Sequence, residues 1–518
     1  MRTLQALGAI ALADFRERTR RESFLVALAL VGWLAFAVAS RRIVLHLDTY
    51  EGVMNAAWLG SLIALVVCVS LGWLGFFLIN SSIELDRRTG TGEILAASPI
   101  SRVQYTVAKW LSNLAVLALL VVLLMTASVF LHWRAMQQSS LDLRALLAPI
   151  VMIAGPLIAL TAACAVLFES VRFLKGGLGT AVWLFGFLIL VPVSMHWATG
   201  RFVGLDLFGF KLLIPSMGAA AKAAFPAYRG GFALGIVPQG EPQLFHWAGL
   251  EWPAWIVMQR LLWLLVAAAL ALLAAAFFDR FDPAVAASVQ PRRGLTELPP
   301  ESVLEPTHER PGAGMLPTAL RRFALGYRLL AEVQLLLKGA SRIWLVVALG
   351  LAVGGLFATS PDARSTLLLL AWIWPVLIWS SMGCREARAG TREFLFGCSH
   401  PLLLQLPAQW LAGFLVTVLA GSGVLLQLLI VGDVASLQAW LAAAVFIPSL
   451  ALMLGVISGA SKVFEVIYLL LCYIGPLNKV EQLDFIRMHA PSAPGVWLAT
   501  AAASLGIALL WRWWQLNR

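Results

Sequence analysis

Twelve apolar runs, each close to the length of a membrane-spanning helix, constrain this chain more than any other feature. A helix needs roughly 20 apolar residues to cross about 30 Å of hydrocarbon. Of the 518 residues, 60% are hydrophobic and 13% charged, and the mean hydropathy is +0.84, which is more apolar surface than a soluble core can bury. We therefore predict an all-α integral membrane protein with about 12 transmembrane helices. The predicted spans are 24–40, 57–80, 106–131, 143–168, 178–198, 254–278, 342–358, 365–383, 407–431, 436–458, 463–477 and 493–515.

The distribution of basic residues predicts the orientation. Most of the 38 Lys and Arg residues fall in segments that an N-terminus on the inside leaves in the cytoplasm. Loops rich in Lys and Arg stay inside, so both termini are predicted to be cytoplasmic and the chain to lie in the cell (inner) membrane. Topology and contact with membrane lipid then account for the net charge of +11. We expect no nucleic-acid partner, since no segment joins a basic patch to a nucleic-acid-binding motif.

A stretch at the inner end of the second predicted span recurs about 300 residues later in the chain. The recurring residues are Arg88, Gly90, Thr91, Glu93 and Leu95, which return without a gap as Arg388, Gly390, Thr391, Glu393 and Leu395. Such a register indicates internal duplication. The sequence thus predicts two tandem six-helix halves, residues 1–278 and 319–518, joined by a proline-rich cytoplasmic linker over 279–318.

Each half is predicted to begin with a short helix ahead of its first span. Leu12-Ala13-Asp14 corresponds to Leu330-Ala331-Glu332, 318 positions later. In both copies apolar residues follow helical spacing along one side, and charged residues occupy the other. A helix of this kind lies in the membrane interface and does not cross the bilayer.

With these elements in place, the chain resembles the permease subunits of ABC-2 type transporters. In that family a charged stretch leaves the second span and runs through Gly-Thr/Ser-x-Glu-x-Leu, then a Pro, then a Lys at the start of the third span. Residues Glu84 to Arg102 match this pattern, with Pro99 in place and Lys109 opening the next span. The second half departs from it, because Ser399 faces Pro99 and Gln409 faces Lys109.

The resemblance implies that this loop docks on a cytoplasmic ABC ATPase, with one nucleotide-binding domain for each half. A glycine at the start of the loop permits a tight turn. The alternative is that these charges only follow the positive-inside rule and lie beside a loop glycine. Membrane topology alone, however, would not place Glu93 and Glu393 in register. The docking residues carried over are Asp86, Arg87, Arg88, Gly90, Thr91, Glu93, Arg102, Glu386, Arg388, Gly390, Thr391 and Glu393.

No segment has the phosphate cradle G-x-x-x-x-G-K-[ST] that ATP hydrolysis would need. We therefore expect no enzyme activity, no catalytic residue and no cofactor in this chain, with ATP and Mg²⁺ held by the partner ATPase. Cys384, Cys398 and His400 lie near one another in sequence, but their spacing is not that of a zinc site. No metal site is predicted.

The region from Trp197 to Pro253 is long and rich in Gly and Pro, and the resemblance implies short re-entrant helices that close an external gate. Its counterpart, Asn478 to Pro494, is shorter, so the gate should be asymmetric. Ionisable residues are scarce in the predicted spans. Glu169 lies near a cytoplasmic end and Arg260 near an outer end, where snorkelling would suffice.

Taken with the resemblance, these features favour the permease subunit of an ATP-driven exporter. It would move a hydrophobic or amphipathic substrate out of the cytoplasm or the inner leaflet. One alternative is a secondary transporter of the major facilitator type, which also has six plus six spans, although the scarcity of buried ionisable groups disfavours a proton-driven mechanism. Another is a non-transporting membrane scaffold or signalling partner of an ATPase, which the weaker motif of the second half keeps open.

Overall fold

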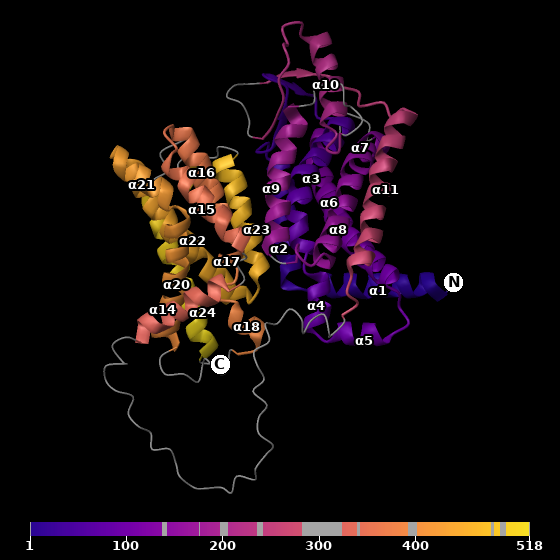
Figure 1. Cartoon of the computed structure of the whole chain (residues 1–518). Helices are drawn as coiled ribbons and strands as arrows, with labels where there is room; N and C mark the ends of the chain where they lie inside the picture. The colour runs from indigo at the N-terminus through magenta and orange to yellow at the C-terminus, as the bar shows by residue number, and fades with distance from the viewer. Residues whose placement is uncertain are drawn as a thin grey trace, which may run out of the picture.

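The computed structural model is mostly helical. It describes residues 2–136, 142–175, 177–196, 206–235, 242–281, 324–338, 342–391, 401–477, 481–486 and 494–516. Two groups of helices stand side by side, one built from each half of the chain (Figure 1). This arrangement places the described parts of the two candidate docking loops, residues 82–97 and 385–391, on the same side of the molecule (Figure 1).

In the first group, α1 lies across the base of the other helices, and the short helices α4 and α5 lie below them (Figure 1). The helices of this group are α1 (Arg2–Thr19), α2 (Glu22–Ala39), α3 (Ala56–Ile79), α4 (Ser82–Arg88), α5 (Thr91–Ala97), α6 (Arg102–Met136), α7 (Leu143–Pro149), the π-helix η1 (Ile150–Ala154), α8 (Gly155–Ser170), α9 (Gly177–His196), α10 (Phe210–Ala224) and α11 (Ala254–Phe277).

In the second group, α14 occupies the base, as α1 does in the first (Figure 1). The helices are α14 (Ala324–Leu337), α15 (Arg342–Leu356), α16 (Pro361–Ile373), α17 (Val376–Trp379), α18 (Arg385–Ala389), α20 (Pro401–Ala420), α21 (Ser422–Val431), α22 (Val434–Ser458), α23 (Ser461–Cys472), the π-helix η4 (Tyr473–Leu477), the 3-10 helix η5 (Glu481–Leu483) and α24 (Pro494–Leu516).

Seven helices in the described residues are long and apolar enough to cross a membrane. A bent pair, Gln405–Ala420 and Ser422–Val431, meets at 63° and would make an eighth span. The mostly helical fold predicted from the sequence is therefore confirmed, and the seven long apolar helices are compatible with a membrane protein. The number of about twelve spans stays a prediction, because helices such as Trp344–Leu356 are shorter. The seven are Ala56–Arg87, Arg102–Leu131, Leu143–Ser170, Ala254–Phe277, Pro361–Trp379, Val434–Ser458 and Pro494–Leu516.

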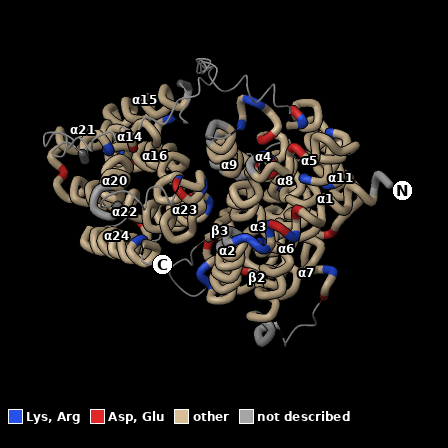
Figure 2. Tube along the Cα trace, turned by 90° about the horizontal axis from the view of Figure 1, so that it is seen from below, with Lys and Arg blue, Asp and Glu red and all other residues tan. Residues whose placement is uncertain are grey.

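The helices differ in what they face. Nearly every residue of α3 is buried, as expected of a helix that is apolar all round and central to its bundle. By contrast, α11 and α24 expose large apolar side chains such as Leu265 and Leu510, which suits contact with lipid. Seen from below, Lys, Arg, Asp and Glu are sparse along the helices and gather around α1, α4, α5 and α23 (Figure 2).

Four short strands, not foreseen from the sequence, tie the two long outer segments of the first half together. Strand β1 (Val44–His46) pairs antiparallel with β3 (Ala233–Gly235), and β2 (Tyr50–Gly52) pairs parallel with β4 (Gln243–Phe245). Asn55 strengthens the link, because its side chain caps α3 and donates to the carbonyl oxygen of Trp247 at 2.7 Å. The outer end of the first half is thus a folded cap that includes α10.

The two groups touch through α2 and α3 on one side and α23 on the other. The rings of Trp73 and Tyr473 lie 5.6 Å apart, edge to face, and those of Phe185 and Trp374 lie 5.1 Å apart. Aromatic pairs at such distances are favourable. The contact is local, and cavities lie on either side of the Trp73 level.

Candidate functional site

A buried cluster of charges joins three elements at the base of the first half. Lys109 of α6 is 2% exposed, and its ammonium lies 2.6 Å from Asp14 Oδ1 of α1 and 2.8 Å from Asp86 Oδ2 of α4. Arg18, one turn after Asp14 on α1, is 2.9 Å from Asp14 Oδ2. Buried charges are tolerated only when paired in this way. The interfacial helix, the charged loop and the third predicted span are therefore held at one point.

Neighbouring polar groups complete the cluster. The Tyr105 hydroxyl donates to Asp86 Oδ2 at 2.6 Å, and the Ser112 hydroxyl donates to Asp14 Oδ2 at 2.6 Å. Because Tyr105, Lys109 and Ser112 follow one another at helical spacing, a single face of α6 presents all three donors. The carboxylates thus have both charge partners and hydrogen bonds.

Glu169, at the end of α8, fixes the start of α4. Its carboxylate accepts backbone N–H bonds from Ser81 at 2.7 Å, Ser82 at 2.9 Å and Ile83 at 2.6 Å. The first N–H groups of a helix have no partner within the helix. A carboxylate placed there accepts hydrogen bonds from them, and its negative charge interacts favourably with the positive end of the helix dipole. Ser81 has a left-handed backbone, with φ of 86°, which lets the chain turn between α3 and α4.

The second half has a corresponding cluster with different chemistry. Glu386 of α18 accepts hydrogen bonds from the side-chain amides of Gln405 and Gln409, each at 2.6 Å, and forms an ion pair with Arg512 of α24. Glu332 of α14 pairs with Arg385 at 3.1 Å. The aligned residues 86 and 386, 109 and 409, and 14 and 332 thus occupy comparable places, and a neutral amide stands where the first half has an ammonium.

The pKa values of the aligned carboxyl groups on α1 and α14 are shifted in opposite directions. Burial alone would raise the pKa of Asp14, but Arg18 and Lys109 outweigh it and lower the pKa. Burial raises the pKa of Glu332, and Arg385 offsets this only in part. A nearby cation favours the charged carboxylate, and desolvation disfavours it. The surroundings of Asp14 therefore favour its charged form, whereas those of Glu332 favour its neutral form.

The charged loop of the first half folds as α4, a glycine turn and α5. Gly90 has a φ of +75° and Gly390 a φ of +64°, a conformation that residues with a side chain rarely adopt, so both glycines make the tight turn predicted for them. Gly92 packs against Phe281, where an added Cβ would lie 2.6 Å from a ring atom. The loop has little freedom to move by itself.

The end of α11 braces this loop from behind. Asp279 pairs with Arg87 at 2.7 Å and with Lys175 at 3.2 Å, and Arg280 donates to the Ser98 carbonyl oxygen at 2.8 Å. The sixth predicted span of the first half is thereby tied to both ends of the loop. Arg512 of α24 makes the equivalent connection in the second half through Glu386.

We call four exposed residues of the candidate loop together the docking face: Thr91, Glu93, Ile94 and Arg102. Ile94 is 73% exposed and belongs to α5, which lies below the bundle (Figure 1). A single exposed apolar side chain does not by itself mark an interaction site, so Ile94 is a candidate contact only together with the polar residues around it. Sequence reasoning did not single out Ile94, although it lies next to Glu93 in the motif.

The other predicted docking residues differ in how exposed they are. Asp86 and Glu386 are buried, which corrects the expectation that their side chains lie on the surface; ion pairing inside the cluster draws them inward. Arg87 is partly buried against Asp279, while Arg388 and Thr391 are exposed. The side chain of Arg88, and all of Glu393, lie outside the described part of the chain.

Arg260 also differs from expectation. It is 2% exposed and does not snorkel to the surface. Its Nη1 donates to the Leu207 carbonyl oxygen at 3.3 Å, and its Nη2 lies 4.0 Å from Asp206 Oδ2. Asp206 in turn caps the start of α10 by accepting from the backbone N–H of Gly209 and Lys211. The segment before α10 covers Arg260, which the sequence could not indicate.

A cavity of about 420 Å³ lies between the two groups of helices, next to α4 and α18. Its lining is polar and includes both signs of charge, with Glu84 and Lys175 from the first half and Arg388 and Lys462 from the second. Among the described residues, no three His, Cys, Asp or Glu side chains come together as metal ligands would. Cys398 and His400 lie outside those residues.

Comparison with protein-family models, with curated proteins and with solved structures finds no match to this chain.

Proposed function

We propose that the chain is the membrane-spanning permease subunit of an ATP-driven exporter of the ABC type, powered by a separate cytoplasmic ATPase. The observation that carries the proposal is the Lys109 cluster, which ties α1, α4 and α6 together directly behind the docking face. A nucleotide-driven machine needs a short, rigid element that transmits motion from the ATPase to the spans. The loop α4–α5 has that position and that support.

The chemistry of the docking face suits a protein partner. Ile94 offers an apolar anchor, and Glu93 and Arg102 offer charges of both signs at its edge. A desolvated apolar centre with a polar rim is the usual composition of a specific interface. Since Asp86 and Glu386 are buried, they would act as positioning residues that hold the loops and would not contact the ATPase.

We further propose that the chain crosses the membrane about twelve times as two tandem repeats, with both termini in the cytoplasm and one nucleotide-binding domain below each half. The comparable placement of Asp86 and Glu386, and of Asp14 and Glu332, supports a duplication. Apolar side chains exposed on α11 and α24 support burial in the membrane.

The cavities between the halves support a hydrophobic or amphipathic cargo. The cavity next to α4 and α18 is polar and charged, whereas a second cavity beyond the Trp73 level is lined mostly by apolar side chains. The polar head of an amphipathic molecule suits the first of these cavities, and its apolar body suits the second. Export from the cytoplasm or the inner leaflet follows the direction implied by the resemblance.

One observation favours an alternative function, a secondary transporter of the major facilitator type. Proton-coupled carriers use buried ionisable groups, and the Asp14, Asp86 and Lys109 cluster places such groups inside the protein. The cluster lies at the base, next to the loop, and not midway along the spans, which favours a mechanical role over proton transfer. A scaffold that only binds an ATPase would share the docking face but lack transport.

Purification from the native membrane separates these possibilities. The affinity-tagged chain, extracted in mild detergent, should bring down a soluble ATPase that hydrolyses ATP, and proteoliposomes of the complex should move cargo only with ATP. A lone chain that transports without ATP would contradict the proposal in favour of a secondary carrier. A complex that hydrolyses ATP without transport of any amphiphile would favour a scaffold.

A further inference from the structure

A cavity of about 500 Å³ lies between the two halves on the outer side of the Trp73 level. This volume falls within the range of roughly 300–1,000 Å³ typical of small-molecule sites. The first half contributes α2, α3, β3 and the turn after α2, and the second half contributes α23, η4 and η5. Neither half could form the cavity alone.

The deep part of the cavity is apolar. Its walls are formed by aliphatic and aromatic side chains from three helices: Trp33, Leu34, Val66, Val69, Leu74 and Leu470. Ser70 also faces this part, but its hydroxyl already donates to the Val66 carbonyl oxygen of its own helix. Such a lining favours hydrocarbon and offers a polar molecule few partners.

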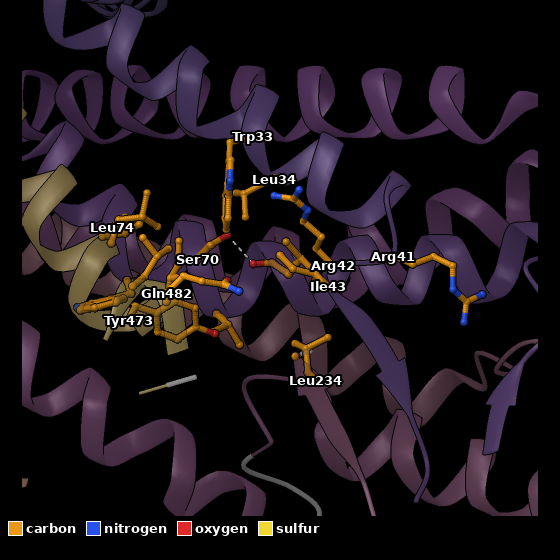
Figure 3. Close-up of a pocket in the computed structure, with 17 residues that line it drawn as sticks. Trp33, Leu34, Arg41, Arg42, Ile43, Ser70, Leu74, Leu234, Tyr473 and Gln482 are labelled. Carbon is orange, nitrogen blue, oxygen red and sulfur yellow. Dashed lines mark hydrogen bonds between the residues drawn. The ribbon is translucent and has the colours of Figure 1, made fainter. Parts of the chain in front are cut away.

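The mouth of the cavity carries positive charge. Arg41, Arg42 and Gln482 lie there and are exposed. Arg41 pairs with Glu51, and it extends away from the other lining residues, whereas Arg42 lies on the side of Trp33 and Leu34 (Figure 3). The Arg42 guanidinium sits 5.3 Å above the ring of Phe36. None of the described residues that line the cavity carries a carboxylate.

The second half shapes the cavity with an irregular helix. Where α23 ends, the chain continues as the π-helix η4, which contains Pro476 and brings Tyr473 and Ile474 into the lining. π-helical turns are rare and occur frequently at functional sites. The turn forms the wall of the cavity that faces Trp73.

From this geometry we infer that the cavity binds the apolar chain of an anionic membrane amphiphile, with its acidic head at Arg42. The hydrocarbon chain lies against Trp33, Val69 and Leu470, and the head remains at the exposed mouth. A cationic head would meet two arginines there and be repelled, and a neutral head would leave the Arg42 guanidinium without a charged partner. The same chemistry fits a resident phospholipid or a passing cargo.

The test uses the full chain alone in phosphatidylcholine nanodiscs, so it does not depend on the ATPase. A phosphatidylglycerol with a photoreactive group in its acyl chain should label the cavity-lining segments of α2, α3 and α23 several-fold more than the matching phosphatidylcholine. Arg42→Gln should reduce the phosphatidylglycerol labelling to the phosphatidylcholine level, and Arg42→Lys should restore most of it.

A pair of matched variants separates the cavity from the general lipid surface. Val69→Phe fills the cavity and should lower labelling several-fold, whereas Val122→Phe, on an exposed face of α6, should not change it. Equal labelling by both lipids, or labelling unchanged in Arg42→Gln and Val69→Phe, would overturn the inference. When excess phosphatidylcholine is added before irradiation, labelling that persists identifies a resident lipid, and labelling that is lost identifies a cargo; both support the site.

Discussion

The ammonium of Lys109 lies 2.6 Å from Asp14 and 2.8 Å from Asp86, and so joins two carboxylates from different helices. In the second half, the aligned Gln409 donates to Glu386 at 2.6 Å. At this aligned position the first half therefore has a cation between two carboxylates, whereas the second half has a neutral amide and pairs Glu386 with Arg512 instead. The consequences of that difference can be measured.

Lys109→Met should destabilise the chain by about 3–5 kcal/mol, because two carboxylates would stay buried with only part of their countercharge. Gln409→Met should cost less, about 1–3 kcal/mol, since Arg512 still pairs with Glu386. Thermal unfolding of the purified chain in detergent would measure both. Lys222→Met, at an exposed position, is the control. Equal losses for the two buried sites would show that the charge of Lys109 is not what matters.

The two interfacial carboxyl groups should respond to pH in opposite directions. The lowered pKa of Asp14 means that its stabilising effect is present above the unfolded pKa of about 3.9 and fades as the pH falls. Asp14→Asn should therefore lower the unfolding temperature at neutral pH but hardly at low pH.

The raised pKa of Glu332 has the opposite effect on the pH dependence of stability. Its contribution is fully present below the unfolded pKa of about 4.3 and is lost as the pH rises through the folded value. Glu332→Gln should raise the unfolding temperature at neutral pH, with the gain shrinking as the pH falls. Unfolding curves across the acidic range would show the two trends, and parallel pH profiles for both variants would contradict the assigned environments.

Glu93→Ala should uncouple ATP hydrolysis from transport more than Glu393→Ala does. Glu93 is exposed on α5, and the loop that carries it is held by Lys109 and braced by Asp279. The first half also keeps the fuller motif. Hydrolysis and transport by reconstituted complexes would be compared for each variant. Equal or inverted effects would remove the functional asymmetry between the halves.

Much of the fold could be predicted from the sequence, because membrane helices are encoded by long local runs. The turns at Gly90 and Gly390 were also predictable, since glycine adopts a left-handed backbone at no steric cost. The strands β1 to β4 were not, because each has only three residues and pairs with a segment far along the chain. Local periodicity holds no information on such pairing.

The candidate site was located by its repeat, but its organisation was not foreseen. Asp86 and Glu386 look like surface charges in a polar loop, and only their partners on other helices show that they are buried. Arg512 lies 126 positions from Glu386, with no motif to connect them. The aligned pair Asp14 and Glu332 was visible in the sequence and was the one available signal for a shared cluster.

The central claim, that this chain docks a separate ATPase through α5, is tested most directly by Ile94→Asp. A charge at this 73% exposed apolar position should disrupt the interface without disturbing the fold. Leu143→Asp is the matched control, at an apolar residue that is 57% exposed near the opposite end of the same bundle (Figure 1). The measurement is the ATPase activity recovered with each tagged chain from the native membrane. We predict that the wild-type chain and Leu143→Asp retain it and Ile94→Asp loses most of it. Recovery unchanged in Ile94→Asp, or absent from the wild-type chain, would contradict the account.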